Sequence, residues 1–160
     1  MAEKRPPLTR SEMMARIRSA DTKPEMIIRK GLHAAGFRFR LHARSLPGRP
    51  DIVMRKHRCV VFIHGCFWHG HEGCPYFRLP KTRPEFWSAK IGANKARDRR
   101  VMNALAKEGW RVLVIWECAT RSIPVSILME TITTWLQGIE TMAELSSNGW
   151  SADERPTSGN

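Results

Sequence analysis

The stretch DIVMRKHRCVVFI at residues 51–63 decides the fold of this chain. Residues 51–55 and 59–63 are rich in β-branched and apolar side chains, and Lys56 and His57 between them mark a tight turn. The second run is continuously apolar, which is typical of a strand in mid-sheet with both faces covered. We therefore expect a two-stranded hairpin inside a larger sheet.

Helices are expected before this hairpin. Thr9 with Glu12, and Thr22 with Glu25, form two Thr-x-x-Glu capping boxes, each of which predicts a helix start. Gly36 is placed to end the second helix. Both capping boxes therefore open helices that precede the sheet.

The remaining elements follow from the period of the apolar residues. An alternating strand is expected at 37–41, a long helix at 84–108, a strand at 110–116 and a last helix at 124–136. The element order α-β-β-β-α-β-α predicts an α/β fold of the α+β kind, a mixed sheet flanked by helices.

Polar ends bound this region. Residues 1–8 are expected to be a flexible basic arm, 9–140 a single domain, and 146–160, which are rich in Gly and Ser, a disordered tail. A chain of 160 residues is long enough for one independent core.

The charge of the chain indicates its partner. A net charge of +12 and a pI near 10.4 favour a phosphate-rich partner, that is, nucleic acid, over a merely soluble basic protein. The first ten residues lack the apolar core of a signal peptide, and no apolar run reaches membrane-spanning length. We therefore expect a cytoplasmic protein with no membrane partner.

Three cysteines and one histidine have the spacing of a metal site. Cys66, His71 and Cys74 lie close in sequence, and Cys118 follows the end of an expected strand. Three thiolates and an imidazole favour a closed structural zinc site, and the alternative is scattered core cysteines with a surface histidine. Cys59, among valines, is interpreted as an inert buried thiol.

Asp51 stands at the start of the hairpin, after a loop rich in Gly and Pro. A Pro-Asp pair is ordinarily a turn, but the second strand returns His64 to the same sheet edge. Asp51 and a backbone carbonyl could then hold magnesium, with His64 and His69 as proton-transfer groups. Glu25 either caps its helix or faces this site, and its spacing favours the cap.

Aromatic pairs and basic residues indicate how a duplex could be opened. Phe67 and Trp68 adjoin a candidate metal ligand, and Phe86 and Trp87 open the long helix. Large apolar side chains can enter between base pairs while cations hold the phosphates. The alternatives are that one aromatic pair belongs to the core and that the basic residues form only a solvated helix face.

Several separated motifs resemble those of the very short patch repair (Vsr) DNA mismatch endonucleases. They are SLPGRPD at 45–51, HGCFWH at 64–69, RPEFW at 83–87, KIGAN at 90–94, RDRR at 97–100, GWRV at 109–112 and WEC at 116–118. The resemblance extends to about residue 136 and implies an endonuclease domain with a restriction-endonuclease-like core.

The resemblance implies an Mg²⁺-dependent hydrolysis that nicks DNA 5′ to the thymine of a T·G mismatch, a lesion left by 5-methylcytosine deamination. It assigns magnesium to Asp51 and the main-chain carbonyl of Ile63, where many members have Thr. It makes His69 the general base, with His64 and Glu25 as supporting active-site residues. It further implies a monomer associated with the bacterial nucleoid, with mismatch-repair proteins as further partners.

The resemblance also assigns the metal and DNA contacts. The structural Zn²⁺ ligands would be Cys66, His71, Cys74 and Cys118. The DNA-contacting residues would be Phe67, Trp68, Trp87, Met14, Lys90 and Asn94. The loop HGHEGC at 69–74 departs from the commonest family form, so His69 competes with His71 for the zinc.

Two other functions fit the same residues. A restriction-type nuclease would cut fully paired duplexes and depend less on Phe67 and Trp68. A non-catalytic DNA-binding protein would use the charge and the zinc site alone. Cleavage of a T·G duplex compared with a C·G duplex separates the three.

Overall fold

A six-stranded mixed sheet forms the centre of the computed structural model, which describes residues 7, 9, 12–13 and 20–152. The strands lie side by side in chain order: β1 (Arg40–Leu41), β2 (Ile52–Met54), β3 (Cys59–His64), β4 (Arg111–Trp116), β5 (Met142–Ser146) and β6 (Gly149–Ala152). The β3–β4 and β4–β5 pairs are parallel and the other pairs are antiparallel. The expected hairpin at 51–63 is therefore present, and the expectation of a mixed sheet is confirmed.

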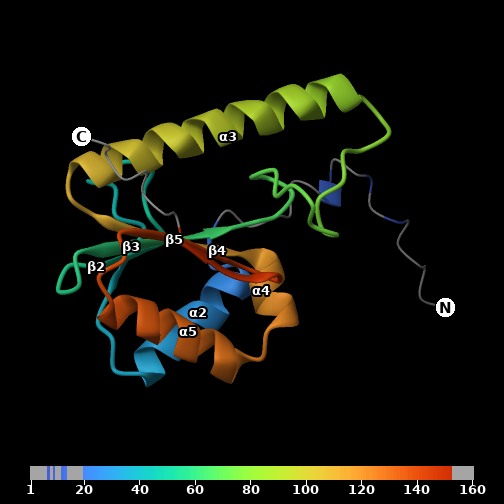
Figure 1. Ribbon diagram of the computed structural model, residues 1–160. Coiled ribbons are helices and arrows are strands. Elements are labelled where there is room, and N and C mark those ends of the chain that lie inside the picture. The colour runs from blue at the N-terminus through green and yellow to red at the C-terminus, as the bar shows by residue number, and fades with distance from the viewer. Residues whose placement is uncertain (1–6, 8, 10–11, 14–19, 153–160) are drawn as a thin grey trace.

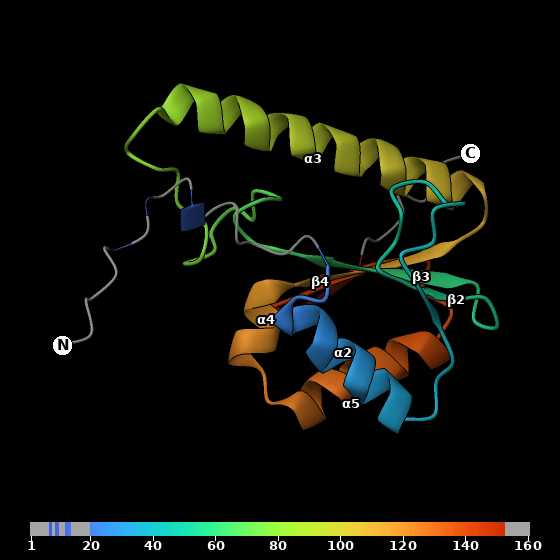
Figure 2. The same ribbon diagram turned by 180° about the vertical axis from the view of Figure 1, so that it is seen from behind.

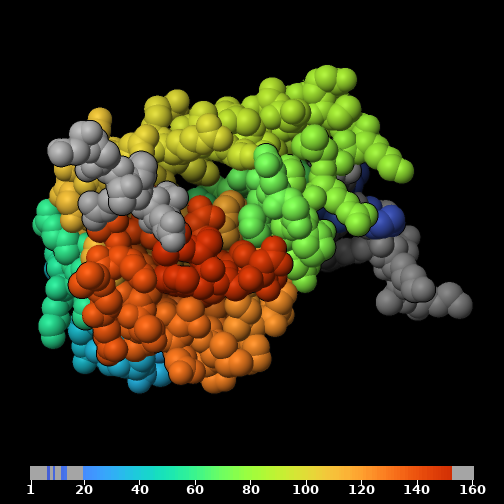
Figure 3. Space-filling view, viewed as in Figure 1, coloured from blue at the N-terminus to red at the C-terminus, as the bar shows by residue number. Residues whose placement is uncertain are grey.

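Helices cover both faces of this sheet. The long helix α3 (Pro84–Lys107) lies along one face, and α2 (Lys23–Ala34), α4 (Glu117–Ser122) and α5 (Val125–Gln137) lie on the other, as both views show (Figures 1 and 2). The segment 65–83 and the first turns of α3 lie together at one end of the molecule (Figure 3). Within the described part of the chain, no helix is long and apolar enough to cross a membrane.

Strand β3 is buried on both faces because it separates two apolar cores. Cys59 and Val61 pack toward α2 and α5, whereas Val60 and Phe62 pack toward α3. This alternation follows from the two-residue period of a strand, and burial on both faces explains why the run is continuously apolar.

The helix ends follow the expected local chemistry. The Thr22 hydroxyl accepts a hydrogen bond from the Glu25 amide at 3.4 Å at the start of α2, and Thr9 and Glu12 form the reciprocal bonds of the first capping box. Gly109 has a φ of +78° directly after α3, a conformation that glycine adopts without strain. Met14 lies outside the described residues, as does most of the expected basic arm.

The structure corrects three expectations. The strand expected at 37–41 is limited to Arg40–Leu41, and α4 follows β4 where no helix was expected. The tail expected to be disordered from residue 146 instead contains β6, so the sheet extends past residue 140, the expected domain end. Trp150 on β6 lies 6.4 Å from Trp135 between ring centroids, and this apolar contact stabilises the strand despite the polar composition around it.

Candidate active site

Asp51 lies immediately before β2, where the hairpin brings Ile63 back to it. The Ile63 amide donates a hydrogen bond of 2.7 Å to the Asp51 carboxylate, whose side chain is 19% exposed. Both residues line a cleft of about 940 Å³. The other polar and aromatic residues of this cleft include Glu25, His64, Trp68, His69 and Asp98.

The Asp51 carboxylate is short of compensating charge. Burial raises its pKa from 3.8 to about 6, the Ile63 amide opposes that rise, and the charge of Glu25 adds to it. A buried carboxylate in this state favours either a proton or a cation. Its hard oxygen ligands suit magnesium, and the Ile63 carbonyl belongs to the residue that Asp51 already contacts.

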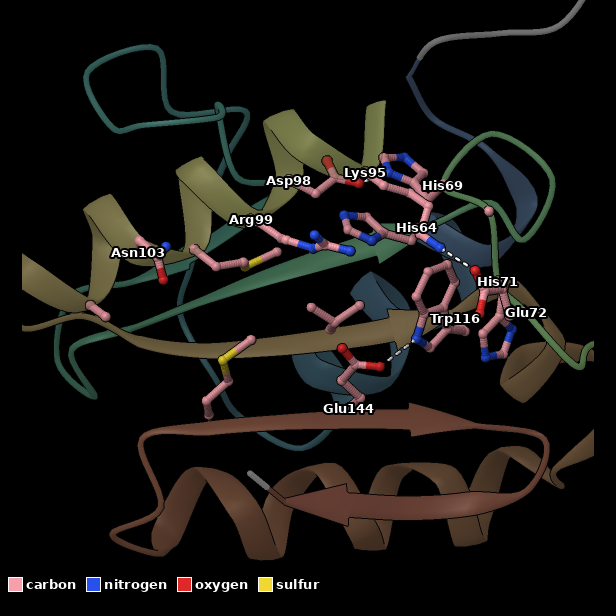
Figure 4. Close-up of a pocket in the computed structure, with 15 residues that line it drawn as sticks. His64, His69, His71, Glu72, Lys95, Asp98, Arg99, Asn103, Trp116 and Glu144 are labelled. Carbon is pink, nitrogen blue, oxygen red and sulfur yellow. Dashed lines mark hydrogen bonds and ion pairs between the residues drawn. The ribbon is translucent and has the colours of Figure 1, made fainter. Parts of the chain in front are cut away.

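Two histidines line the same cleft as Asp51: His64 at the end of β3 and His69 in the loop that follows. Figure 4 labels both. The rings of His64 and His69 stack with centroids 3.7 Å apart and planes 1° apart. Nδ1 of His69 lies 2.7 Å from a carboxylate oxygen of Asp98. If Nδ1 carries the proton in that bond, Nε2 of His69 is the nitrogen able to accept one.

The environment gives the two histidines different roles. Burial, followed by the electrostatic interaction with the His69 ring, lowers the pKa of His64 to about 3, so the His64 ring is neutral at physiological pH. Burial opposes ionisation of Asp98, but the hydrogen bond with His69 holds the pKa of Asp98 below its usual value. The ionised Asp98 therefore lies 2.7 Å from Nδ1 of His69, where it can accept a hydrogen bond from that nitrogen.

Asp98 is a site residue that sequence reasoning missed, although the RDRR motif contains it. Asn94 lies one helical turn before it on α3 and donates a hydrogen bond of 2.9 Å to the Trp68 carbonyl. The spacing of four residues puts both polar side chains on one helix face. An acid inside a basic run on that face was the available signal.

Glu25 lies in the first turn of α2 and also lines the cleft that contains Asp51. Its buried carboxylate accepts hydrogen bonds from the Asp21 amide at 3.1 Å and from Arg29 at 2.6 Å. His42, also missed from the sequence, lies 3.7 Å from Glu25 and 3.8 Å from Asp51, through its two ring nitrogens. His42 has a φ of +47°, an uncommon conformation for a non-glycine residue that is often found at functional sites.

A second cluster lies behind the histidine pair. One ligand atom from each of four side chains falls within 4.8 Å of the others, so the cluster could hold a metal ion: Cys66, His71, Cys74 and Cys118. Nδ1 of His71 lies 3.6 Å from the Cys118 sulfur, whereas His69 is bonded to Asp98. The structure thus brings His71, and not His69, to the thiols. Cys59 lies apart from them in the core, where burial raises its pKa to about 12.

The aromatic residues of the loop and of α3 form one group beside the cleft. The Phe67 ring centroid lies 5.1 Å from that of Trp68 and 5.5 Å from that of Trp87, both edge to face. The Lys90 ammonium lies 5.4 Å from the Trp68 ring centre and 5.7 Å from that of Trp87. Four of the predicted DNA-contacting residues are therefore neighbours, with Phe86 at the edge of the group.

Comparison with known proteins gives a family match for this chain. The profile of the family described as DNA mismatch endonuclease Vsr matches residues 2–75. The chain is 43% identical over 152 residues to DNA mismatch endonuclease Vsr of Escherichia coli (strain K12), covering 93% of this chain and 97% of the relative. It is 53% identical over 118 residues to the type II nicking enzyme V.XorIIP of Xanthomonas oryzae pv. oryzae (strain KACC10331 / KXO85), covering 74% and 86% respectively. The family resemblance noted in the motifs is thereby confirmed, and the chain belongs to the family of Vsr DNA mismatch endonucleases.

Proposed function

We propose that this protein is a magnesium-dependent endonuclease that hydrolyses one phosphodiester bond of duplex DNA, 5′ to the thymine of a T·G mismatch. The observation that carries the proposal is the meeting of Asp51 and the His69–Asp98 pair in one cleft, beside a group of aromatic side chains. The matched relatives are named as a mismatch endonuclease and nicking enzymes.

Asp51 and the carbonyl of Ile63 would hold the magnesium ion. The raised pKa of Asp51 supports this assignment, because a cation would offset the burial of its charge. When bound, magnesium would neutralise phosphate charge and lower the pKa of coordinated water. His42 would keep Asp51 oriented toward the cleft, since its ring lies 3.8 Å from Asp51 and 3.7 Å from Glu25.

His69 would act as the general base through Nε2. The proton taken from the attacking water would leave the ring positively charged, and the Asp98 carboxylate at 2.7 Å would stabilise that charge. His64 would stay neutral because it is buried, and its stacked ring would keep His69 in place.

Cys66, His71, Cys74 and Cys118 would hold a structural zinc ion. Thiolate and imidazole ligands suit zinc, and four protein ligands leave no position for a reactive water. The ion would order the segment 65–83, which contains His69 and the aromatic residues but has no helix or strand.

The aromatic group would enter the duplex at the mismatch. Phe67, Trp68 and Trp87 are neighbours and present large apolar surface, and Met14 is assigned to the opposite groove by the family resemblance. Lys90 and Asn94 on α3 would contact the DNA nearby, and the net charge of +12 favours binding to phosphates.

The proposal includes the remaining expectations of the resemblance. A restriction-endonuclease-like core agrees with a mixed sheet that carries its acidic residue at a strand end. A monomeric protein that acts in the cytoplasm, alongside mismatch-repair proteins, would match the proposed substrate. Its proposed substrate arises from deaminated 5-methylcytosine.

One cleavage assay tests the proposal. The protein is incubated with Mg²⁺ and end-labelled duplexes that differ only in one pair, T·G or C·G, within a cytosine-methylation site. Nicking of the T strand alone is the expected result, and Asp51→Ala should bind the duplex without nicking it. Cutting of both duplexes would instead establish a restriction-type nuclease, and binding without cleavage a non-catalytic protein.

A further inference from the structure

Trp116 lies between His71, a residue of the metal cluster, and the His64–His69 pair (Figure 4). It ends β4 and is paired with His64 in the β3–β4 register. Its ring stacks on His71 with centroids 4.1 Å and planes 6° apart, and its edge contacts the His64 ring at 5.3 Å and 75°. One buried side chain thus touches a candidate zinc ligand and the neighbour of the proposed general base.

Glu144 holds the indole in this position. The Trp116 Nε1–H donates a hydrogen bond of 3.0 Å to the Glu144 carboxylate, which comes from β5, the next strand of the sheet. This contact satisfies the polar atom of a side chain that is otherwise in apolar surroundings. The position of the ring is therefore set by two strands and not by packing alone.

The His64 ring depends on its neighbours for its orientation. Within residues 20–152 its side chain makes no hydrogen bond, and the rings that it contacts are those of Phe62, His69 and Trp116. A cavity of about 550 Å³ lies next to it, under α3, and is lined by His64, His69 and Trp116. Loss of the indole would enlarge this space and leave His64 free to turn away from His69.

We propose that Trp116, held by Glu144, is a positioning residue that keeps the His64–His69 stack aligned and links it to the metal cluster. The proposal rests on the proposed function for its effect on nicking. Trp116 acts through His64 and itself touches neither the substrate nor the reacting atoms. A misplacement of about 1 Å at a reacting group lowers a rate by about 100-fold, which sets the scale of the effect.

The test compares Trp116→Leu with Trp110→Leu. Trp110 is equally buried and lies just before the other end of β4, where it contacts Arg58 rather than the histidines. Both variants should lose stability, but only Trp116→Leu should slow single-turnover nicking, by about 10- to 100-fold, with duplex affinity within about twofold. Trp116→Phe keeps a ring but loses the hydrogen bond to Glu144, so it should slow nicking several-fold rather than 10- to 100-fold.

The role of Glu144 in holding the indole is tested by a second pair of variants. Glu144→Ala should slow nicking several-fold, and Glu144→Gln, whose amide oxygen still accepts the indole N–H, should restore it. A slowing of Trp116→Leu no greater than that of Trp110→Leu would overturn the proposal. Recovery of Trp116→Leu by added zinc would overturn it too, because the indole would then act through metal content alone.

Two measurements are independent of nicking. In excess chelator, zinc should dissociate faster from Trp116→Leu than from Trp110→Leu, since His71 loses its stacked partner. The NMR chemical shifts of the His64 ring protons should change only in Trp116→Leu. Unchanged shifts would refute the positioning role whatever the enzyme cleaves. If the wild-type protein fails to nick T·G but Trp116→Leu shows these changes, only the proposed function is refuted.

Discussion

Replacing Asp51 by asparagine should stabilise the metal-free active site while abolishing nicking. The asparagine oxygen can still accept the 2.7 Å hydrogen bond from the Ile63 amide, but the buried charge is gone. The folded protein holds the Asp51 proton with a pKa of about 6, compared with 3.8 for the ordinary group. Folding therefore favours the protonated carboxyl.

The pH dependence of this effect has a definite sign. As pH rises from about 3.8 to about 6, the unfolded chain loses its Asp51 proton first, so the stability of the folded protein falls, and it stays lower above that range. The difference between the two pKa values corresponds to about 3 kcal/mol at neutral pH, an upper value because part of the side chain reaches solvent. Asp51→Asn should recover about 1 to 3 kcal/mol of this at pH 7.5 and nothing below pH 4.

Thermal unfolding of zinc-loaded, magnesium-free protein measures the effect. A gain of about 1 to 3 kcal/mol raises Tm by roughly 3 to 10 °C for a chain of this size. Glu130→Gln, at an exposed position on α5, is the matched control and should leave Tm unchanged across the same pH range. Magnesium at 100 times its Kd should stabilise the wild type by about 2.7 kcal/mol and leave Asp51→Asn unaffected.

Three outcomes would refute the reasoning. Equal or lower stability of Asp51→Asn at pH 7.5 would show that the buried charge is already compensated within the protein. A difference independent of pH would show that its origin is packing rather than ionisation. Magnesium stabilisation of Asp51→Asn equal to that of the wild type would place the ion elsewhere.

The other predictions concern the general base, the zinc site and the aromatic group. Asp98→Asn should slow nicking by about 100-fold or more with duplex affinity retained, because the His69 ring, once it has taken a proton, loses its carboxylate partner. A single-turnover rate near that of the wild type would exclude a catalytic role for the His69–Asp98 pair. Cys118→Ser should lose zinc and unfold at a lower temperature, whereas Cys59→Ser should keep one zinc per chain, as atomic absorption would measure. Trp68→Ala should weaken binding to the T·G duplex by about 10-fold or more at unchanged zinc content. Equal affinity of variant and wild type in a titration would show that Trp68 does not enter the duplex.

Much of the fold was predictable from local patterns. Burial on both faces left residues 59–63 of β3 and 112–116 of β4 continuously apolar. The limits of α3 follow from Pro84 at its start and Gly109 after its end. Strand β6 was not predictable from composition, because its stability comes from Trp150 meeting Trp135 across the fold. Gly149, which follows the turn at 147–148 and has a φ of +99°, was the local signal, since glycine adopts this conformation without strain.

By itself, the sequence determined which residue types are available for chemistry and which elements carry them. Cys66 and Cys74 are close in the chain, and Asp51 begins a hairpin that returns to it, so their neighbourhoods are local properties. The choice of His71 for the thiols and of His69 for Asp98 is different. The two histidines are separated by one residue, and spacing cannot tell which way each ring points.

Only the tertiary structure decided that choice. The parallel register of β3 with β4 places Trp116 beside His64, and α3 crosses the same face to bring Asp98 to His69. These contacts join residues 29 or more positions apart, whose distances depend on sheet register and helix packing rather than on any local period. The candidate site is therefore Asp51 together with the His64–His69–Asp98 group, which the fold brings to one cleft.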